Sequence, residues 1–307
     1  MKAHFHKFLS NLFRIFAKLM PQVACFVHND SHYDFSKPAV LVANHQSHLD
    51  LLYTLMLSPK VVALTNKWVW NCPFYRWIIR YADCLPVDNG WERNLPKLQD
   101  LVAQGYSILV FPEGTRSADC TIGRFHQGAF ALAEQLQVEV VPIVLHGVGH
   151  VFPKREFILN KGRVDVTILS PFVIDNQAVS TEQRMLSVTR SFRHRFIEEY
   201  KKICVEVETP AYFKELVTAN YLYKGTEVAR ECRRQMRHFQ QFEQRIAELP
   251  DSGSVVLRDC GQGEFALLAA LVKKDLQITA VGSDAEMLEV ARNCAACPAN
   301  LRFVEGS

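Results

Sequence analysis

The chain has 307 residues, of which 49% are hydrophobic and 22% are charged, a composition typical of globular proteins and unlike that of disordered chains. Its 35 basic residues are nearly balanced by 32 acidic ones, and a formal net charge of +3 is too small to indicate nucleic-acid binding. The nine cysteines are scattered except for Cys294 and Cys297, which favours a reduced, cytosolic-side protein over a disulfide scaffold or a zinc site.

The first segment, residues 1–20, predicts an amphipathic helix. At about 100° per residue its large apolar side chains form one face, and Lys7, Arg14 and Lys18 lie opposite. The apolar face consists of Phe5, Phe8, Leu9, Leu12, Phe13, Phe16, Leu19 and Met20. Such a helix can lie in the headgroup layer of an anionic membrane or dock on its own domain, and amphipathicity alone does not separate the two.

The rest of the sequence gives no sign of a segment that crosses a membrane. No uninterrupted apolar run approaches the ~18 residues of a spanning helix, and the N-terminus lacks the pattern of a signal peptide. We therefore expect a peripheral protein on the cytoplasmic face of the cell membrane.

From residue 38 onward, apolar runs alternate with helical patterns, which is the order of an α/β domain. We predict such a domain at residues 21–208, with a mixed sheet flanked by helices. The strand-like runs are 38–43, 60–65, 106–111, 138–147 and 162–169, and the helix-like segments are 48–57, 73–81, 94–104 and 127–137.

The stretch VANHQSHLDLL, residues 42–52, puts polar residues where a strand pattern gives way to a helix pattern. On one continuous helix His45 and Asp50 would lie about 140° apart, so we expect His45 in the preceding turn and Ser47 as the N-cap. An imidazole that is oriented by a carboxylate suits general-base catalysis. Two other interpretations stay open, because Ser47 and Asp50 also form a capping box and His45 and His48 could ligate a metal.

A second motif, FPEGTRS at residues 111–117, follows the strand-like run YSILV. It supplies the Glu113 carboxylate, the Thr115 hydroxyl and the Arg116 guanidinium. Arg116 can hold a phosphate through two parallel hydrogen bonds, and Gly114 lets backbone amides approach that phosphate. Because ligands of open α/β sheets bind at strand ends, the motif predicts part of a binding site.

Together, NHxxxxD and FPEGTR resemble the glycerolipid acyltransferase family, which includes the 1-acylglycerol-3-phosphate acyltransferases. The resemblance extends from residue 38 to about residue 170 and includes the VVPI strand at 140–143. It implies that His45 takes the proton from an acceptor hydroxyl as that hydroxyl attacks an acyl thioester. Asp50 would orient the imidazole and stabilise its charge.

The same resemblance implies the substrates. The acceptor would be a lysophospholipid such as 1-acylglycerol 3-phosphate at a membrane surface, and the donor an acyl-CoA or acyl-carrier-protein thioester. No acyl-enzyme, cofactor or metal is expected. The residues implied on the substrate side are Glu113, Gly114, Thr115, Arg116, Lys67 and Pro142.

Residues 209–250 are charged, helical in pattern and interrupted at Gly225, and we interpret them as a helical linker. Their arginines are typical of a solvated helix face, with phospholipid contact as the alternative. The turn signal PDSG at 250–253 marks a boundary. Residues 251–307 then follow the order strand, glycine turn, helix, strand and helix, which is half of a Rossmann-like unit.

The whole layout resembles the acyltransferase and methyltransferase portion of bacterial trifunctional proteins that also contain a transporter. Gly261 and Gly263 match the turn that binds S-adenosylmethionine in methyltransferases. However, Leu257 stands where that pattern has an aspartate, and Gly282 stands where an acidic residue would hold the ribose. We interpret residues 251–307 as a truncated or degenerate methyltransferase-like domain, and S-adenosylmethionine is not expected as a cofactor.

Three other functions stay open. Acylation of another hydroxylated lipid or pigment precursor is weakly disfavoured by Arg116. A methyltransferase whose N-terminal domain positions lipid is disfavoured by Leu257 and Gly282. A non-catalytic lipid-binding module is disfavoured by the intact His45, Asp50 and Glu113.

Overall fold

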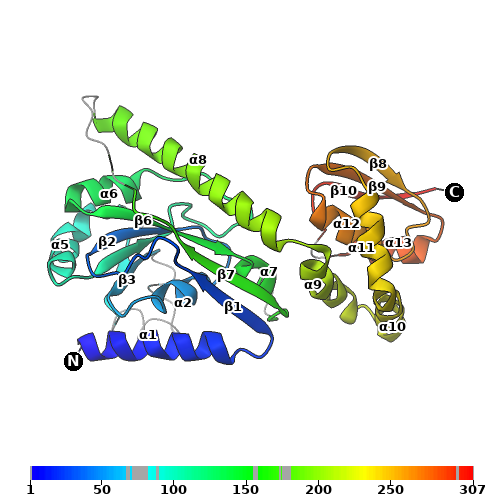
Figure 1. The fold of residues 1–307 in the computed structure, drawn as a ribbon, viewed down its shortest axis with the longest axis horizontal. Helices are drawn as coiled ribbons and strands as arrows, with labels where there is room; N and C mark the ends of the chain where they lie inside the picture. Colours follow the sequence, from blue (N-terminus) through cyan, green and yellow to red (C-terminus); the bar gives the residue numbers. More distant parts are fainter. Residues whose placement is uncertain are drawn as a thin grey trace. The chain divides into compact units, whose positions relative to one another are not determined.

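The computed structural model describes residues 2–66, 70, 82–87, 90–154, 158–172, 174, 181–294 and 297–306. The chain forms two compact units (Figure 1). The first comprises Met1–Leu159 and Arg163–Lys202, and the second comprises Asn160–Gly162 and Ile203–Ser307.

The first unit is built on a seven-stranded sheet in the order β1-β7-β6-β2-β5-β3-β4. The pairings from β6 to β4 are parallel and the pairing of β6 with β7 is antiparallel, so the sheet is mixed, as predicted. Its strands are β1 Val23–His28, β2 Ala39–Ala43, β3 Val61–Thr65, β4 Leu85–Pro86, β5 Ser107–Val110, β6 Glu139–His146 and β7 Gly162–Ile168. The five strand-like runs are confirmed, whereas β1 and β4 were not predicted.

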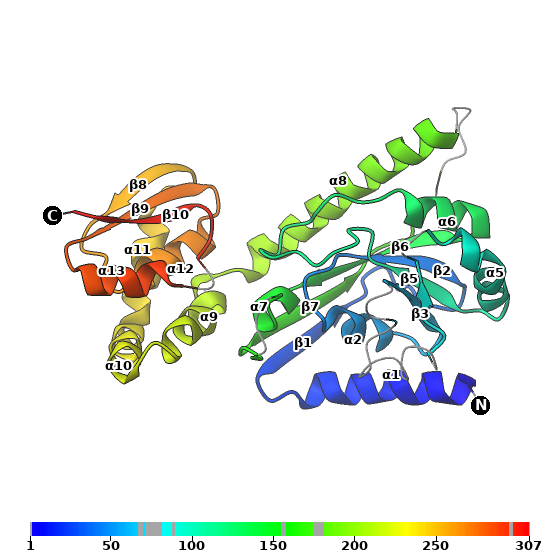
Figure 2. The same cartoon turned by 180° about the vertical axis from the view of Figure 1, so that it is seen from behind.

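Helices α1 and α2 lie on one side of this sheet, and α6 and α8 lie on the other (Figures 1 and 2). The helices are α1 Lys2–Leu19, α2 Asp50–Leu55, η1 Glu92–Asn94, α5 Leu95–Ala103, α6 Gly128–Leu136, α7 Val148–Val151 and α8 Thr181–Val207. Three of the predicted helical segments correspond to α2, α5 and α6. The helix predicted at 73–81 lies outside the described residues.

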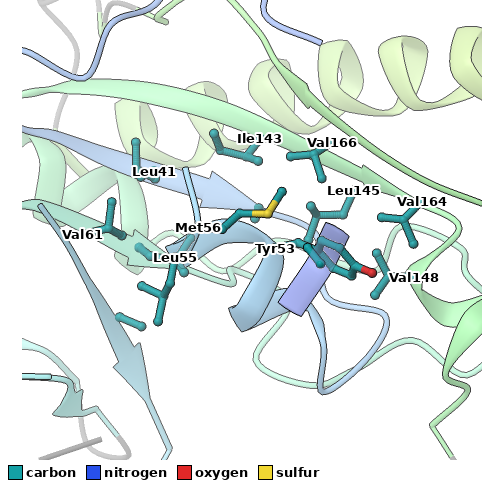
Figure 3. Packing of buried hydrophobic residues seen from close by; sticks show 14 of the residues in the cluster. Leu41, Tyr53, Leu55, Met56, Val61, Ile143, Leu145, Val148, Val164 and Val166 are labelled. Carbon is teal, nitrogen blue, oxygen red and sulfur yellow. The ribbon is translucent and has the colours of Figure 1, made fainter. Parts of the chain in front are cut away.

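The central strands are buried on both faces, which explains why they are continuous apolar runs in the sequence. Every residue of β2 is buried. Leu41 belongs to the cluster that contains Tyr53 of α2 (Figure 3). Because successive strand residues point to opposite faces, Val40 faces the other layer. In that layer Phe130 of α6 packs edge to face on Phe192 of α8, with ring centroids 4.9 Å apart.

Helix α1 docks on the first unit with one stripe and exposes another apolar stripe. Leu9 and Met20 belong to the core. Arg14 donates to the carbonyls of Met56 and Leu57, 2.6 and 2.9 Å away, just after α2. Arg14 is exposed, and its guanidinium also supplies donors to these carbonyls, because carbonyls at a helix C-terminus lack intrahelical donors. The exposed stripe consists of Phe8, Leu12, Ile15, Phe16 and Leu19.

The second unit has a three-stranded parallel sheet in the order β10-β9-β8. Strands and helices alternate along the chain in this part. The elements are β8 Gly253–Leu257, α12 Glu264–Val272, β9 Leu276–Gly282, α13 Ala285–Arg292 and β10 Leu301–Glu305. They are preceded by α9 Pro210–Leu222, α10 Thr226–Gln235, η2 Met236–His238 and α11 Phe239–Glu248.

The segment predicted as a linker, residues 209–250, packs into the same core as this small sheet. Phe213 and Phe242 from its helices share one buried cluster with Leu267 of α12. The segment is thus an integral part of the second unit, because its apolar side chains cover the sheet's helices. Its exposed Arg230 pairs with Glu227 one turn away, as expected for a solvated helix face.

Candidate active site

A histidine and an aspartate are paired just beyond the C-terminal end of β2, where the chain turns into α2. His45 Nδ1 lies 2.7 Å from Asp50 Oδ2. The His45 side chain is 25% exposed, whereas the Asp50 side chain is fully buried. The imidazole stacks on Phe111, with ring centroids 4.4 Å apart. Because the carboxylate holds Nδ1, Nε2 is the nitrogen that can meet a substrate.

Asp50 also organises the turn before α2. Its Oδ2 accepts the backbone N–H groups of Gln46 and Ser47 at 2.6 and 2.7 Å. Helix α2 begins at Asp50, and no side chain caps it. The predicted N-cap role of Ser47 is wrong, because Leu49 is the N-cap residue. The Ser47 hydroxyl donates to the Phe152 carbonyl at 2.7 Å and accepts the Leu49 N–H at 3.3 Å, within the turn before the helix. Of the two hydrogen bonds of a capping box, the structure has the one in which the Asp50 carboxylate accepts the Ser47 N–H.

The FPEGTRS loop after β5 forms hydrogen bonds with both the backbone N–H and the backbone carbonyl of His45. Glu113 Oε1 accepts the His45 N–H at 2.9 Å, and Ser117 N–H donates to the His45 carbonyl at 2.7 Å. Glu113 Oε2 accepts the Gly123 N–H at 2.8 Å. Burial raises the pKa of Glu113, while the two amides and the His45 charge oppose that shift. Through these contacts Glu113 connects the FPEGTR loop to the NHxxxxD turn. Its substrate-binding role stays a prediction.

Arg116 lies in the same cluster of charges. Burial lowers its pKa, and the nearby Asp50 carboxylate opposes that shift. Burial, Arg116 and His45 all lower the pKa of His48, which favours a neutral imidazole beside the guanidinium. Among the described residues, Arg116 Nη1 is buried without a hydrogen-bond partner. A buried donor without an acceptor is costly, and an anionic substrate oxygen would satisfy it.

Two residues of the loop, Gly114 and Thr115, are exposed to solvent. Gly114 is exposed and has a φ of 68°, a conformation that favours glycine. Thr115 is exposed, and its hydroxyl oxygen lies 3.4 Å from Lys154 Nζ. Lys154 also donates to the Arg116 carbonyl at 2.6 Å. Lys154 was not predicted from the sequence, because its position beside the loop depends on tertiary structure.

A buried glutamine next to His45 is a second residue that the sequence analysis missed. Gln46 Nε2 donates to the Cys120 carbonyl at 3.1 Å and to the Tyr200 hydroxyl at 2.9 Å. Its Oε1 accepts the Gly149 N–H at 3.5 Å. The turn that contains His45 is therefore connected by hydrogen bonds to the loop after Arg116, to α7 and to α8.

The remaining predicted substrate-side residues are Lys67 and Pro142. Lys67 lies outside the described residues. Pro142 is a buried residue of β6 that pairs with Val42 of β2, and its carbonyl accepts the Leu169 N–H at 3.0 Å. Its contacts are those of a strand residue, and a role in the wall of the site stays a prediction.

The two glycines that were matched to the turn that binds S-adenosylmethionine lie in the connection between β8 and α12. Gly261 and Gly263 have φ values of 55° and 88°. A Cβ at Gly263 would come within 2.8 Å of Phe303, so packing alone requires glycine there. A Cβ at Gly282 would lie 3.1 Å from the Cys260 sulfur, and Asp284 uses its carboxylate to cap α13. These residues do not fit the ribose-binding pattern of S-adenosylmethionine.

Known proteins share the part of the chain that carries this site. Residues 24–146 match the family model described as Acyltransferase. The chain is 37% identical over 139 residues to the chloroplast 1-acyl-sn-glycerol-3-phosphate acyltransferase of Arabidopsis thaliana, covering 44% of this chain and 39% of that one. It is 33% identical over 146 residues to the alpha form from Bos taurus, covering 46% and 51%. The chain thus spans about half or less of these relatives' length.

A solved structure shares the fold of the first unit. The 1-acyl-sn-glycerophosphate acyltransferase of Thermotoga maritima matches with a TM-score of 0.53 and 24% identity, covering 65% of this chain and 82% of that chain. The segment that matches the family model described as Acyltransferase, residues 24–146, contains His45, Asp50 and Arg116.

Proposed function

We propose that the protein is an O-acyltransferase that moves a fatty acyl group from a thioester to the free hydroxyl of a lysophospholipid, most simply 1-acylglycerol 3-phosphate. The observation that carries the proposal is the juxtaposition of the His45–Asp50 pair with the unpartnered Nη1 of Arg116. A base beside an anion-binding group is what a phosphorylated alcohol acceptor requires. The names of the relatives from Arabidopsis thaliana and Bos taurus support the same acceptor class.

In this mechanism His45 works through Nε2. The acceptor oxygen attacks the thioester carbonyl carbon while its proton passes to Nε2, and Asp50 holds Nδ1–H and balances the imidazolium charge. Collapse of the tetrahedral intermediate breaks the C–S bond, and the departing thiolate takes the proton from Nε2. The ester and a free thiol, from coenzyme A or an acyl carrier protein, are the products. No acyl-enzyme and no further cofactor take part.

Product analysis tests the proposal directly. Purified protein is given both thioester donors with lysophospholipid, phosphate-free alcohol and S-adenosylmethionine, and the products are identified by mass spectrometry. Diacylglycerol 3-phosphate is the expected product. An acyl ester of a phosphate-free lipid or pigment precursor would instead support the other acceptor class, and a methylated product would support a methyltransferase.

Arg116→Lys is expected to weaken binding of the acceptor but not of the donor. Lysine keeps the charge and loses the planar fork that can form two parallel hydrogen bonds to a phosphate. Since a hydrogen bond to a charged group contributes about 1.5–3 kcal/mol, the acceptor KM should rise by roughly 10- to 100-fold. Steady-state kinetics measure both KM values, with the exposed Arg124→Lys as control. An equal rise for donor and acceptor would show that Arg116 does not bind the phosphate.

We also propose that the exposed stripe of α1 attaches the protein to an anionic membrane surface. Phe8, Phe16 and Leu19 are 60%, 51% and 72% exposed. Lys7 and Lys18 on the same helix are exposed, and each basic residue near such a surface contributes about 1 kcal/mol. In the part of the chain that the structure describes, no helix has the length and apolarity to span a bilayer.

The triple change of Phe8, Leu12 and Phe16 to serine is expected to release the protein from anionic liposomes. Each large apolar side chain contributes about 1.5–3 kcal/mol when buried, so the partition coefficient should fall at least about tenfold. Flotation measures it, and turnover of a short-chain soluble acceptor should not change. Deleting residues 1–20 is a poorer test, because Leu9 and Met20 would leave the core.

The matched control replaces Tyr223 and Val256 with serine, because both are well exposed in the second unit. This control should float like the wild type. If the α1 variant also floats unchanged, the attachment proposal is wrong.

A further inference from the structure

We propose that Lys154 is a second cation of the acceptor site and that Lys154 and Arg116 together select a phosphate monoester over a phosphodiester. The inference rests on the function proposed above and identifies a residue that distinguishes acceptors by the charge of their phosphate group. It follows from the position of the Lys154 ammonium, 2.6 Å from the carbonyl oxygen of Arg116 and 3.4 Å from the Thr115 hydroxyl. The second cation thus lies directly on the loop that carries the first.

Both cations keep donors for a ligand. An ammonium group has three N–H donors, and the Arg116 carbonyl and Thr115 hydroxyl take two of them. Arg116 has five donors, and its buried Nη1 has no partner among the described residues. Gly114 and Thr115 are exposed, so an acceptor can reach this loop from solvent.

Among the described residues, the neighbouring carboxylates form hydrogen bonds with other groups and no ion pair with Arg116 or Lys154, although the Asp50 charge still acts on Arg116. Asp50 Oδ2 is held by the His45 imidazole and two backbone amides, and both oxygens of Glu113 accept backbone amides. His48 has a lowered pKa, so it adds little positive charge of its own. The loop therefore presents two cationic groups beside His45, and neither is held in an ion pair within the described residues.

Two positive charges match one class of lysophospholipid best. A phosphate monoester carries about −1.5 to −2 charge at pH 7, because its second pKa is near 6. A phosphodiester carries a single negative charge and one fewer charged oxygen. A second cation therefore improves binding of the monoester more than binding of the diester, which is how a difference in affinity becomes specificity.

The test compares two acceptors that differ in that charge alone, 1-oleoylglycerol 3-phosphate and its phosphate methyl ester. Lys154→Ala should raise the KM of the monoester by roughly 10- to 100-fold, the equivalent of one charge-assisted hydrogen bond. The KM of the methyl ester should rise clearly less and that of the donor should not change, so the preference for the monoester shrinks. Lys154→Arg keeps a cation there and should restore most of that preference.

A matched control and a stability measurement separate this role from a structural one. Lys60 also donates to a backbone carbonyl, that of Gln104 at 3.5 Å, and Lys60→Ala should leave every KM unchanged. If Lys154→Ala instead raises both acceptor KM values equally, or lowers the thermal midpoint together with kcat, Lys154 only tethers the loop and the inference is wrong. An unchanged monoester KM also overturns it. A wild-type protein that esterifies neither acceptor overturns the proposed function, and this inference with it.

Discussion

His45→Ala is expected to lower the rate of acyl transfer by roughly 10² to 10⁴, the usual contribution of a general base. The imidazole is 25% exposed and stacks on Phe111, and Asp50 keeps its two backbone amides when the imidazole is removed. The variant should therefore stay folded, with an unfolding midpoint close to that of the wild type. Single-turnover rates at saturating donor and acceptor measure the chemical step apart from binding.

The chain offers a matched control for this variant in a second histidine–aspartate pair. His28 Nε2 lies 2.8 Å from Asp165 Oδ1, almost the separation of His45 from Asp50. This pair joins β1 to β7 and has no contact with the FPEGTR loop in the described part of the chain. His28→Ala should keep near-normal turnover. Near-normal turnover by His45→Ala would remove the general base from the mechanism, and a loss in both variants would point to structural damage.

The sequence predicted the centre of the sheet well because the central strands are buried on both faces. A run such as AVLVA contains no polar side chain for a surface, so it indicates a buried strand. In the structure every residue of β2 is buried. Edge strand β1 was missed for the opposite reason. Its sequence, VACFVH, is almost entirely apolar although Phe26 and Val27 are 45% and 49% exposed. The strand therefore lacks the alternation of apolar and polar residues that marks a half-exposed strand.

The missed helix α8 did carry a signal. Phe192, Phe196 and Tyr200 follow one another at intervals of four and are all buried, but the helix is otherwise so polar that only this narrow stripe marks it. The omission matters for the site, because the Tyr200 hydroxyl accepts from Gln46 beside the base. Sequence motifs thus predicted the candidate reacting groups and not the helix that packs behind them.

The contacts within the site were predictable only where one short segment contains both partners. His45 and Asp50 lie in one turn, so spacing alone indicated that the carboxylate faces the imidazole. Glu113 clamps the His45 amide from a different strand, and Lys154 approaches the loop from beyond β6. Both positions follow from the order of strands in the sheet, which periodicity does not give.

Asp50→Asn is expected to combine a large loss of rate with a moderate loss of stability. The neutral amide cannot balance an imidazolium, so the chemical step should slow by roughly 10² to 10⁴. Asp50 Oδ1 is buried without a partner among the described residues, and an amide nitrogen in its place would be an unpaired buried donor. That donor should lower the free energy of unfolding by about 1–3 kcal/mol.

Asp165→Asn separates the two effects. Asp165 is also buried and accepts from His28 and Arg163, so its amide variant should lose stability by the same physical cause. Denaturant unfolding gives the stability of each variant, and single-turnover rates are then divided by the folded fraction. The rate per folded molecule should fall for Asp50→Asn and stay near wild type for Asp165→Asn. If both variants lose stability and Asp50→Asn keeps its rate per folded molecule, the buried carboxylate only shapes the turn, and the charge of the imidazolium is balanced elsewhere.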